Sequence, residues 1–369
     1  MKYFKTDGIR GIIGEDLTLD LISKIGRAIS VLNIKEIYIG YDTRESNNLI
    51  LFSLVSSLLA KGIDVINVGI VSTPSLQYFS KKHNYTTLMI TASHNPYFYN
   101  GIKIFKNGEK LKDEEELLIE SNLDNIDLSI SKIGKYKTSN IVKKEYLKYL
   151  SSLKEESNHK ILLDLSNGAT IEIVNDLFKN DKNIKIINNK SNGVNINDKV
   201  GSLYIDKIDL LDNDYLFSFD GDGDRVLFKD SKRVYDGDLI VYLLARYYKL
   251  SSVVLTNNVN EGLLKAFKKH KIKVFISEVG DKNVYNLMKA NNIRLGGETS
   301  GHIIDLMNMN SGDGVLNFLL INKVLNKIDI NDYLSEVEYY PFINMNVSKE
   351  YPLDYLNFIK EKYHNKARM

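Results

Sequence analysis

Three aspartates at alternate positions, separated by single glycines, form the stretch of this sequence best suited to hold a cation. They are Asp220, Asp222 and Asp224. Carboxylates this close repel one another unless a cation is bound, and the glycines let the backbone curl until the three side chains converge. A calcium-binding EF-hand is excluded because its sixth position would be Arg225 and its twelfth Ser231. An arginine beside so few carboxylates indicates magnesium that shares its ligands with a phosphate; the alternative is a solvated acidic turn.

The second candidate for chemistry is Ser93, which follows the strand-like residues 87–91. Open α/β sheets place reactive groups at the carboxyl ends of their strands. A serine there, with His94 beside it and Lys103 ten residues on, combines a nucleophile with two candidates for proton transfer. Acyl transfer is the competing hypothesis, but the Gly-x-Ser-x-Gly turn of such enzymes is absent. Taken alone, a serine at such a position is more often an ordinary turn residue, and a lone histidine such as His94 is more often a hydrogen-bonded structural residue than a catalyst.

A third candidate is the glycine-rich segment at residues 296–302. Its composition excludes a helix or the interior of a strand, so we expect a loop whose backbone approaches a ligand closely. Glu298 and Ser300 offer a carboxylate and a hydroxyl that suit two neighbouring hydroxyl groups, and His302 is a further candidate contact. The alternative is a tight crossover with the glutamate in solvent.

Together these motifs resemble the signature set of the α-D-phosphohexomutase family. The matching segments are residues 6–11, residues 91–96 with 100–103, residues 220–225 and residues 296–302. Any one of them could arise by chance, but four in the family's order along the chain are a specific signal. The resemblance covers nearly the whole chain.

The resemblance implies a role for each matching residue. Ser93 would be phosphorylated in the resting enzyme and would carry the phosphoryl group, with His94 and Lys103 as acid/base candidates. Arg10 would stabilise the phosphoryl group in transfer; without the resemblance, a surface salt bridge explains Arg10 equally well. The implied magnesium ligands are Ser93, Asp220, Asp222 and Asp224. The implied substrate contacts are Arg225, Gly280, Glu298, Ser300 and His302. A hexose 1,6-bisphosphate would serve as activator and intermediate.

The sequence favours the glucosamine-type branch of this family. Residues 193–197 with 201–202, residues 279–281 and residues 311–314 are similar to that branch. Thr299 departs from it, because glutamine is usual there, and Lys282 stands where arginine is common. We therefore expect conversion of glucosamine 6-phosphate to glucosamine 1-phosphate, with mannose and glucose phosphates as alternative substrates. A phosphatase and a non-catalytic sugar-phosphate sensor are the alternatives from other classes.

The elements that must position these residues alternate between strands and helices, which predicts an α/β protein. We expect three similar layered α/β domains with mixed, mostly parallel sheets, at residues 1–138, 139–236 and 237–337. The expected strands include residues 38–41, 64–68, 87–91, 102–105, 160–165, 215–219 and 253–256. Helices are expected at residues 49–59, from Thr73 as a cap followed by Pro74, and from Asp113, Ala169 and Glu261. Asn107 and Gly108 predict a hairpin turn.

Residues 338–369 are expected to begin a smaller fourth α+β domain, with a strand at 342–347 and a helix at 353–363. Family members carry in this domain a loop that grips the non-reacting phosphate, and the sequence ends at Met369, where that loop would begin. We therefore expect an incomplete phosphate-binding domain and weakened substrate binding.

Charge and composition narrow the remaining classes. The 49 basic and 47 acidic residues give a net charge of +2, which argues against nucleic acid or an anionic membrane as partner. The absence of cysteine excludes disulfides and thiolate metal sites. Because the sequence lacks both an apolar segment of membrane-spanning length and a signal-like start, we expect a cytoplasmic enzyme. The oligomeric state is left open, with a homodimer as one option.

Overall fold

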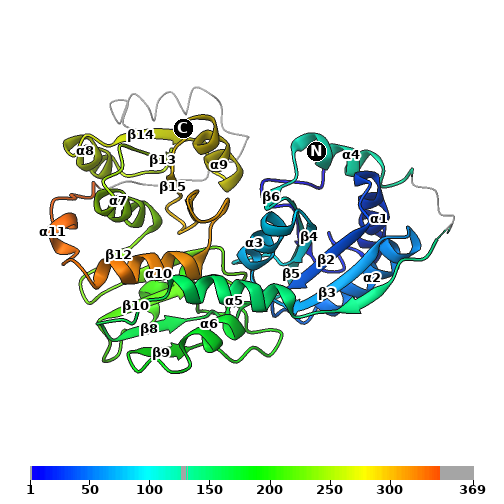
Figure 1. Ribbon diagram of the computed structural model, residues 1–369, viewed down its shortest axis with the longest axis horizontal. Helices are drawn as coiled ribbons and strands as arrows, with labels where there is room; N and C mark the ends of the chain where they lie inside the picture. Colours follow the sequence, from blue (N-terminus) through cyan, green and yellow to red (C-terminus); the bar gives the residue numbers. More distant parts are fainter. Residues whose placement is uncertain (1, 126–129, 131, 341–369) are drawn as a thin grey trace.

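Three β-sheets, each accompanied by helices, follow one another along the chain (Figure 1). The structure is a computed structural model that describes residues 2–125, 130 and 132–340. Each sheet has parallel strands at its centre and antiparallel pairs toward one edge. The α/β class and the three mixed sheets are as predicted, whereas the expected fourth domain falls almost entirely outside the described residues.

The first sheet has the strand order β1-β5-β4-β2-β3-β7, and β6 pairs with β5. Its strands are β1 Ile9–Ile12, β2 Glu36–Tyr41, β3 Asp64–Ile70, β4 Thr86–Ile90, β5 Tyr99–Lys106, β6 Glu109–Lys110 and β7 Tyr136–Thr138. Its helices are α1 Leu19–Ala28, α2 Asn47–Ala60, α3 Thr73–His83 and α4 Asp113–Ser121, with a 3-10 turn at Ile29–Leu32. Alternate residues of β2 point into two separate cores: Ile37 and Ile39 into one, Tyr38 into the other. Both faces of this sheet are therefore covered, as parallel sheets require.

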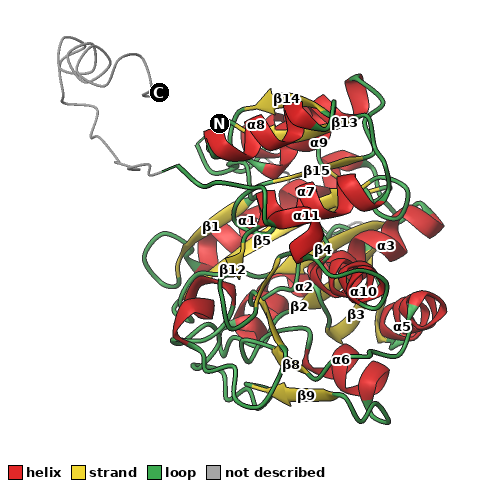
Figure 2. Ribbon diagram, turned by 90° about the vertical axis from the view of Figure 1, so that its left-hand side faces the viewer, coloured by secondary structure: helices red, strands yellow, loops and turns green. Residues whose placement is uncertain are grey.

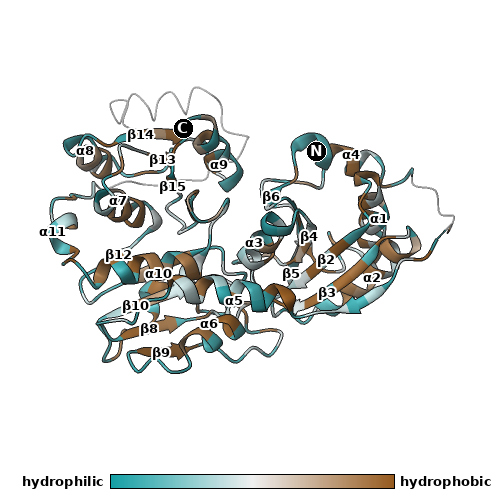
Figure 3. Ribbon diagram, viewed as in Figure 1, coloured by the Kyte–Doolittle hydropathy of each residue, from teal (hydrophilic) through white to brown (hydrophobic). Residues whose placement is uncertain are grey.

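The second sheet has the order β12-β11-β10-β8-β9, and Figure 3 shows β8 and β9 as strongly hydrophobic. Its strands are β8 Ile161–Asp164, β9 Ile184–Ile187, β10 Tyr215–Phe219, β11 Val226–Lys229 and β12 Val234–Tyr235. Its helices are α5 Ile141–Leu153 and α6 Ile171–Phe178, with a 3-10 helix at Ser202–Lys207.

The third sheet has the order β14-β13-β15-β16. Its strands are β13 Ser252–Thr256, β14 Lys273–Ser277, β15 Leu295–Gly297 and β16 Ile303–Asp305. The helices of this part are α7 Gly237–Tyr247, α8 Glu261–Lys269, α9 Asp281–Ala290, α10 Gly314–Leu325 and α11 Asn331–Leu334. None of the helices in the described part of the chain is long and apolar enough to cross a membrane.

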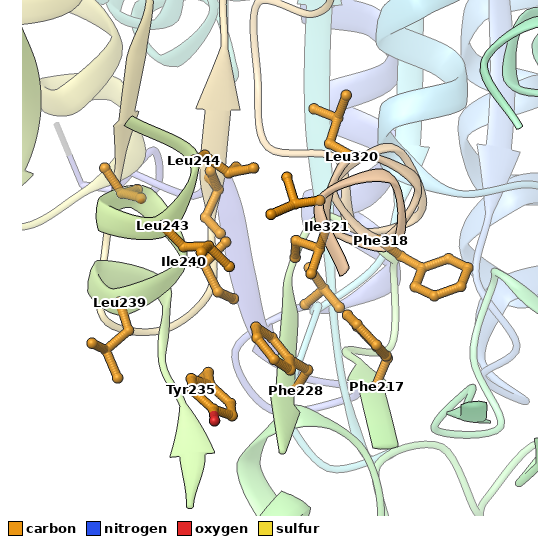
Figure 4. Close-up of a cluster of buried hydrophobic side chains, with 14 of the residues drawn as sticks. Phe217, Phe228, Tyr235, Leu239, Ile240, Leu243, Leu244, Phe318, Leu320 and Ile321 are labelled. Carbon is orange, nitrogen blue, oxygen red and sulfur yellow. The ribbon is translucent and has the colours of Figure 1, made fainter. Parts of the chain in front are cut away.

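Helix α10 joins the second and third sheets into one hydrophobic core. Figures 1 and 2 show α10 between α7 on one side and the second sheet on the other. Phe318 of α10 packs edge-on against Phe217 of β10, with ring centroids 4.8 Å apart, and Figure 4 shows Leu243 and Leu244 of α7 in the same cluster. Every residue of α10 except Lys323 is buried, so α10 fixes how these two sheets sit relative to each other.

Two helix starts differ from the prediction because the residues concerned form hydrogen bonds with residues 220–225. We call these residues, which follow β10, the aspartate loop. Ser72 holds the N-cap position of α3, and Thr73 is its first helical residue. The backbone N–H of Thr73 donates to the carbonyl of Asp222. The second difference is α6, which begins at Ile171 rather than at Ala169, because the N–H of Ala169 donates to the carbonyl of Gly221.

The predicted hairpin turn is present between β5 and β6. Asn107 and Gly108 have φ values of 56° and 78°, which is the left-handed pair that a two-residue hairpin turn requires. Within the described residues, the other predicted strands and helices are present with boundaries shifted by a few residues at most. The strand predicted at 342–347 and the helix predicted at 353–363 lie outside the described residues.

The three sheets present their motif loops at equivalent places. Residues 91–96 follow β4, residues 220–225 follow β10 and residues 298–302 follow β15. Each loop thus leaves the carboxyl end of a central strand, where α/β proteins bind their ligands.

Candidate active site

Ser93 is buried against the aspartate loop of the second sheet. Its side chain is inaccessible to solvent, and its Oγ donates a hydrogen bond to Oδ2 of Asp220 at 2.7 Å. The backbone at Ser93 has a φ of 51°, in the left-handed region that residues other than glycine rarely adopt. A strained residue of this kind persists only where its surroundings hold it.

The three aspartates converge as the sequence predicted. One carboxylate oxygen from each of Asp220, Asp222 and Asp224 lies within 4.8 Å of the others, and all three residues are buried. Oδ2 of Asp222 accepts hydrogen bonds from Oγ1 of Thr73 and Nζ of Lys103, both at 2.6 Å. Nζ of Lys103 also lies 3.2 Å from Oδ2 of Asp224. The single positive charge of Lys103 therefore lies beside two of the three carboxylates.

These residues fit a divalent cation that prefers oxygen ligands. Oδ1 of Asp222 and Oδ1 of Asp224 are buried and have no hydrogen-bond partner among the described residues. Burial, together with the charges of Asp224 and Asp222, raises the pKa of Asp220 well above its usual value. Buried carboxylate oxygens without donors, in a group that repels itself, are the arrangement that a bound magnesium would stabilise.

Lys103 and His94 differ in protonation. Burial alone would lower the pKa of Lys103, but Asp222 and Asp224 outweigh it and the net pKa is raised, so Lys103 stays cationic. Burial and the nearby Arg225 and Arg10 lower the pKa of His94 to about 4, so its ring is neutral near pH 7. Nδ1 of His94 lies 3.5 Å from Oγ of Ser93.

Two arginines complete the charged surroundings of the serine. Arg10, on β1, pairs with Asp7 at 3.3 Å, and Arg225 lies 3.7 Å from Oδ1 of Asp224. Nε of each arginine is buried without a hydrogen-bond partner among the described residues. Unused donors of this kind beside a cation site suit the oxygens of a phosphoryl group.

The glycine-rich loop after β15 brings Glu298 toward the same region. Oε1 of Glu298 accepts a hydrogen bond from the backbone N–H of Gly280 at 2.9 Å. Burial alone would lower the pKa of Arg225, but the charges of Asp224, Asp220, Asp7 and Glu298 outweigh it and the net pKa is raised. His302 is buried, with Nε2 3.6 Å from Oδ2 of Asp281 and no hydrogen-bond partner for Nδ1 within the described part of the chain. Ser300 is half-buried. Glu298 and His302 thus contact two consecutive residues, Gly280 and Asp281.

Thr299 points away from this surface into the protein. Its Oγ1 donates to Oδ2 of Asp238 at 2.7 Å. Burial and the neighbouring Asp236 raise the pKa of Asp238 to about 8, so its carboxyl group is neutral near pH 7. The position that departs from the glucosamine-type pattern therefore anchors the loop.

A band of polar contacts joins α9 of the third sheet to the first sheet. Nζ of Lys110 lies 2.6 Å from Asp281, and Nζ of Lys282 lies 2.6 Å from Asp113 and 3.1 Å from Glu116. Sequence reasoning singled out Lys282 only as a departure from arginine; its partners lie more than 160 residues away, beyond the reach of any local pattern.

Thr73 was identified from the sequence only as a helix cap. Its hydroxyl instead positions Asp222, and a threonine followed by proline after a strand carries no signal of that use. Residues 91–96, which contain Ser93, form the serine loop. Arg44 and Asn197 contact this loop and were likewise missed as site residues.

Comparison with known proteins shows the family of the chain. Residues 1–129 match the family model described as phosphoglucomutase/phosphomannomutase, alpha/beta/alpha domain I, and residues 236–339 match that of domain III. Phosphoglucosamine mutase of Dictyoglomus thermophilum is 37% identical over 370 residues, which cover 93% of this chain and 81% of that protein. The chain belongs to the phosphohexomutase family. Phosphoglucosamine mutase of Clostridioides difficile is 35% identical over 97% of this phosphohexomutase and 86% of the relative.

Solved structures have the same fold as this phosphohexomutase. A putative phosphomannomutase from Thermus thermophilus superposes with a TM-score of 0.77 at 21% identity, over 90% of this chain and 82% of that one. The N-acetylphosphoglucosamine mutase of Aspergillus fumigatus, solved with GlcNAc-6P and magnesium, has a TM-score of 0.59 at 17% identity, over 92% and 80% of the two chains.

Proposed function

We propose that this phosphohexomutase is a phosphoglucosamine mutase, which interconverts glucosamine 6-phosphate and glucosamine 1-phosphate. The contact of Ser93 Oγ with Asp220 in a buried group of three aspartates carries this proposal, because it combines a phosphoryl acceptor with a magnesium site. The substrate rests on the relatives, which are named phosphoglucosamine mutases at about one-third identity.

Ser93 acts as the phosphoryl carrier in this proposal. A sugar hydroxyl attacks the phosphorus of phosphorylated Ser93, the bond from phosphorus to the serine Oγ breaks, and the hydroxyl proton passes to a base. The resulting glucosamine 1,6-bisphosphate turns around, and Ser93 Oγ then takes the other phosphoryl group. A hexose 1,6-bisphosphate supplied from outside would load Ser93 at the start.

The residues around Ser93 divide into a base and cations. We assign proton transfer to His94, whose neutral ring lies 3.5 Å from Ser93 Oγ. Lys103 keeps its proton because two aspartates surround it, so charge neutralisation suits it better than proton transfer. Asp220, Asp222, Asp224 and a Ser93 phosphate oxygen would hold magnesium, which when bound neutralises charge on the transferring phosphoryl group.

Substrate recognition falls to residues around the loop after β15. Glu298 and Ser300 would accept and donate hydrogen bonds to neighbouring sugar hydroxyls, with Gly280 and His302 beside them. Arg10 and Arg225 would bind phosphoryl oxygens through their unused donors. Positioning the sugar in this way provides much of the catalysis that phosphoryl transfer needs.

A coupled assay for glucosamine 1-phosphate tests this function. Glucosamine 6-phosphate, magnesium and a catalytic amount of hexose 1,6-bisphosphate are supplied to the native chain and to Ser93→Ala, with Ser152→Ala on the exposed face of α5 as the matched control. We expect turnover in the native chain and the control and none in Ser93→Ala.

Parallel reactions separate the alternatives. Faster turnover of mannose or glucose phosphate would reassign the substrate within the family. Release of inorganic phosphate without isomerisation would indicate a phosphatase, and binding of sugar phosphate by calorimetry without turnover or labelling of Ser93 would indicate a sensor.

A further inference from the structure

The backbone of Ser93 is held from two sides by residues of two different sheets. On one side stands Arg44, which follows β2 and whose side chain is fully buried. On the other stands Asn197, from the segment between β9 and β10 of the second sheet. Neither residue touches the aspartates of the candidate magnesium site in any contact described above.

Arg44 binds almost the whole serine loop through its guanidinium group. Nη2 donates to the carbonyl of Ser93 at 2.8 Å and to that of Asn95 at 2.9 Å. Nη1 donates to the carbonyls of Pro96 and Tyr99. A planar guanidinium with five donors can serve several carbonyls at once, which a lysine cannot reproduce.

Asp42 orients this arginine and also reaches the amide side of the serine. Its Oδ2 accepts from Nε of Arg44 at 2.8 Å and from Oγ1 of Thr91 at 2.7 Å. The hydroxyl oxygen of Thr91 in turn accepts from the backbone N–H of Ser93 at 2.9 Å. Both the N–H and the carbonyl of Ser93 are therefore fixed through one buried ion pair.

Asn197 adds the contact from the second sheet. Its Nδ2 donates to the carbonyl of Ser93 at 2.9 Å and to that of Asn95 at 3.2 Å. Its own backbone N–H donates to the carbonyl of Ser166, which ties it to the loop that follows β8. The serine loop is thus held in place by the same sheet that supplies Asp220.

We propose that Arg44 and Asn197 are positioning residues that hold Ser93 in its left-handed conformation and so aim its Oγ at Asp220. Without these donors the backbone relaxes to an ordinary conformation and Oγ turns away, because the strained conformation is stable only while its surroundings fix it. The inference rests on the proposed phosphoryl transfer by Ser93. It follows that Ser93 Oγ points toward Asp220 only while the first and second sheets are in contact.

Two variants remove hydrogen-bond donors to the carbonyl of Ser93. Arg44→Lys keeps a positive charge beside Asp42 but loses the forked donors. Asn197→Gly removes the amide yet tolerates the φ of 57° at this position. The matched control is Arg294→Lys, because Arg294 makes a similar two-bonded pair with Asp305 without contacting the serine loop.

Steady-state kinetics and Mn²⁺ affinity give the first readout. We expect kcat, and the rate at which labelled hexose 1,6-bisphosphate phosphorylates Ser93, to fall by roughly ten- to a hundredfold in both variants, because small misplacements of a reacting atom cost this much. KM, and the Mn²⁺ affinity of the unphosphorylated chain, should stay within about threefold of native, since the loop at residues 298–302 and the three aspartates are untouched. The control should match the native chain. Unchanged kcat in both variants, or Mn²⁺ affinity that falls in step with kcat, would overturn the proposal.

Hydrogen exchange of the peptide that spans residues 91–99 provides a readout without turnover. Exchange there should accelerate in Arg44→Lys and Asn197→Gly and stay native in the control, and equal exchange in all four chains overturns the inference. A native chain that neither turns over nor becomes labelled would refute the proposed function instead, and the exchange result would then decide the positioning role alone.

Discussion

Ser93 Oγ donates its hydrogen bond to Asp220 Oδ2 at 2.7 Å, so the candidate phosphoryl carrier and the candidate metal loop share one contact between two sheets. The serine comes from the loop after β4 and the aspartate from the loop after β10, 127 residues further along the chain. A cation held by Asp220 would therefore lie next to the oxygen that receives the phosphoryl group.

Replacing Asp220 by asparagine tests the metal site directly. Asp220→Asn keeps the shape of the side chain but removes one negative charge from a group of three, so Mn²⁺ affinity should fall by roughly tenfold or more. Electron paramagnetic resonance of free Mn²⁺ measures this. Asp206→Asn, which changes an exposed carboxylate, is the matched control. Equal affinity in Asp220→Asn and the native chain would mean that the ion binds elsewhere.

In the absence of magnesium, the positive charge of Lys103 should stabilise the buried carboxylates of Asp222 and Asp224. Lys103→Met leaves Asp222 and Asp224 buried without their partner, which should lower the free energy of unfolding by about 3 kcal/mol or more in chelator. Magnesium should then stabilise the variant more than it stabilises the native chain, because the ion replaces the lost charge. Urea unfolding with and without magnesium measures both effects.

The control for this prediction is a second lysine of the same strand. Lys106→Met removes a pair with Glu115 that is partly exposed, so its effect should be at most about 1 kcal/mol and independent of magnesium. Equal losses in the two variants would show that Lys103 does not act through the aspartate loop.

The sequence predicted the convergence of the three aspartates because the signals for it are local. Strands ending in reactive loops, and glycines between three carboxylates, are visible within short windows around Ser93 and Asp222. The charge repulsion that implies a cation also follows from spacing alone. The three sheets follow from the alternation of elements in the same way.

What the sequence did not reveal depends on contacts between distant segments. The hydroxyl of Thr73 is an equally good cap or ligand until the aspartate loop is placed beside it. The largely apolar sequence of α10 indicates a buried helix but does not say that it packs on β10. Thr299 reads as a departure in the recognition loop, yet its partner Asp238 lies beneath the loop.

The contact between α9 and the first sheet should help to set substrate affinity. Lys282→Glu places a like charge against Asp113 and Glu116, so α9 and the adjoining Gly280 should move away from the first sheet. KM should rise by about five- to tenfold with little change in kcat, because this removes binding common to substrate and transition state. Steady-state kinetics at low salt measure the change.

A charge reversal is the control for that prediction. Glu116→Lys combined with Lys282→Glu restores an opposite-charge pair in the reverse order, and KM should return most of the way to native. High salt should narrow the differences, since it screens partly exposed charges. A double variant no better than Lys282→Glu would show that the substitution acts through something other than charge.

The free energy of unfolding of the native chain should depend on pH through the protonation of Asp313, which caps α10. Burial raises the pKa of Asp313 to about 6 from an ordinary value of 3.8, and Oδ1 of this residue accepts a hydrogen bond from Tyr146 at 2.7 Å. Between pH 4 and pH 6 the unfolded chain releases this proton before the folded one, so folding loses stability as pH rises and the loss is complete above pH 6. Two pKa units correspond to about 3 kcal/mol.

Asp313→Asn retains the cap and cannot ionise. Urea unfolding should therefore show that the free energy of unfolding of this variant, relative to that of the native chain, rises by about that amount from pH 4 to pH 7. Asp206→Asn should show no such trend, and parallel curves for Asp313→Asn and the native chain would mean that the buried carboxyl group titrates normally.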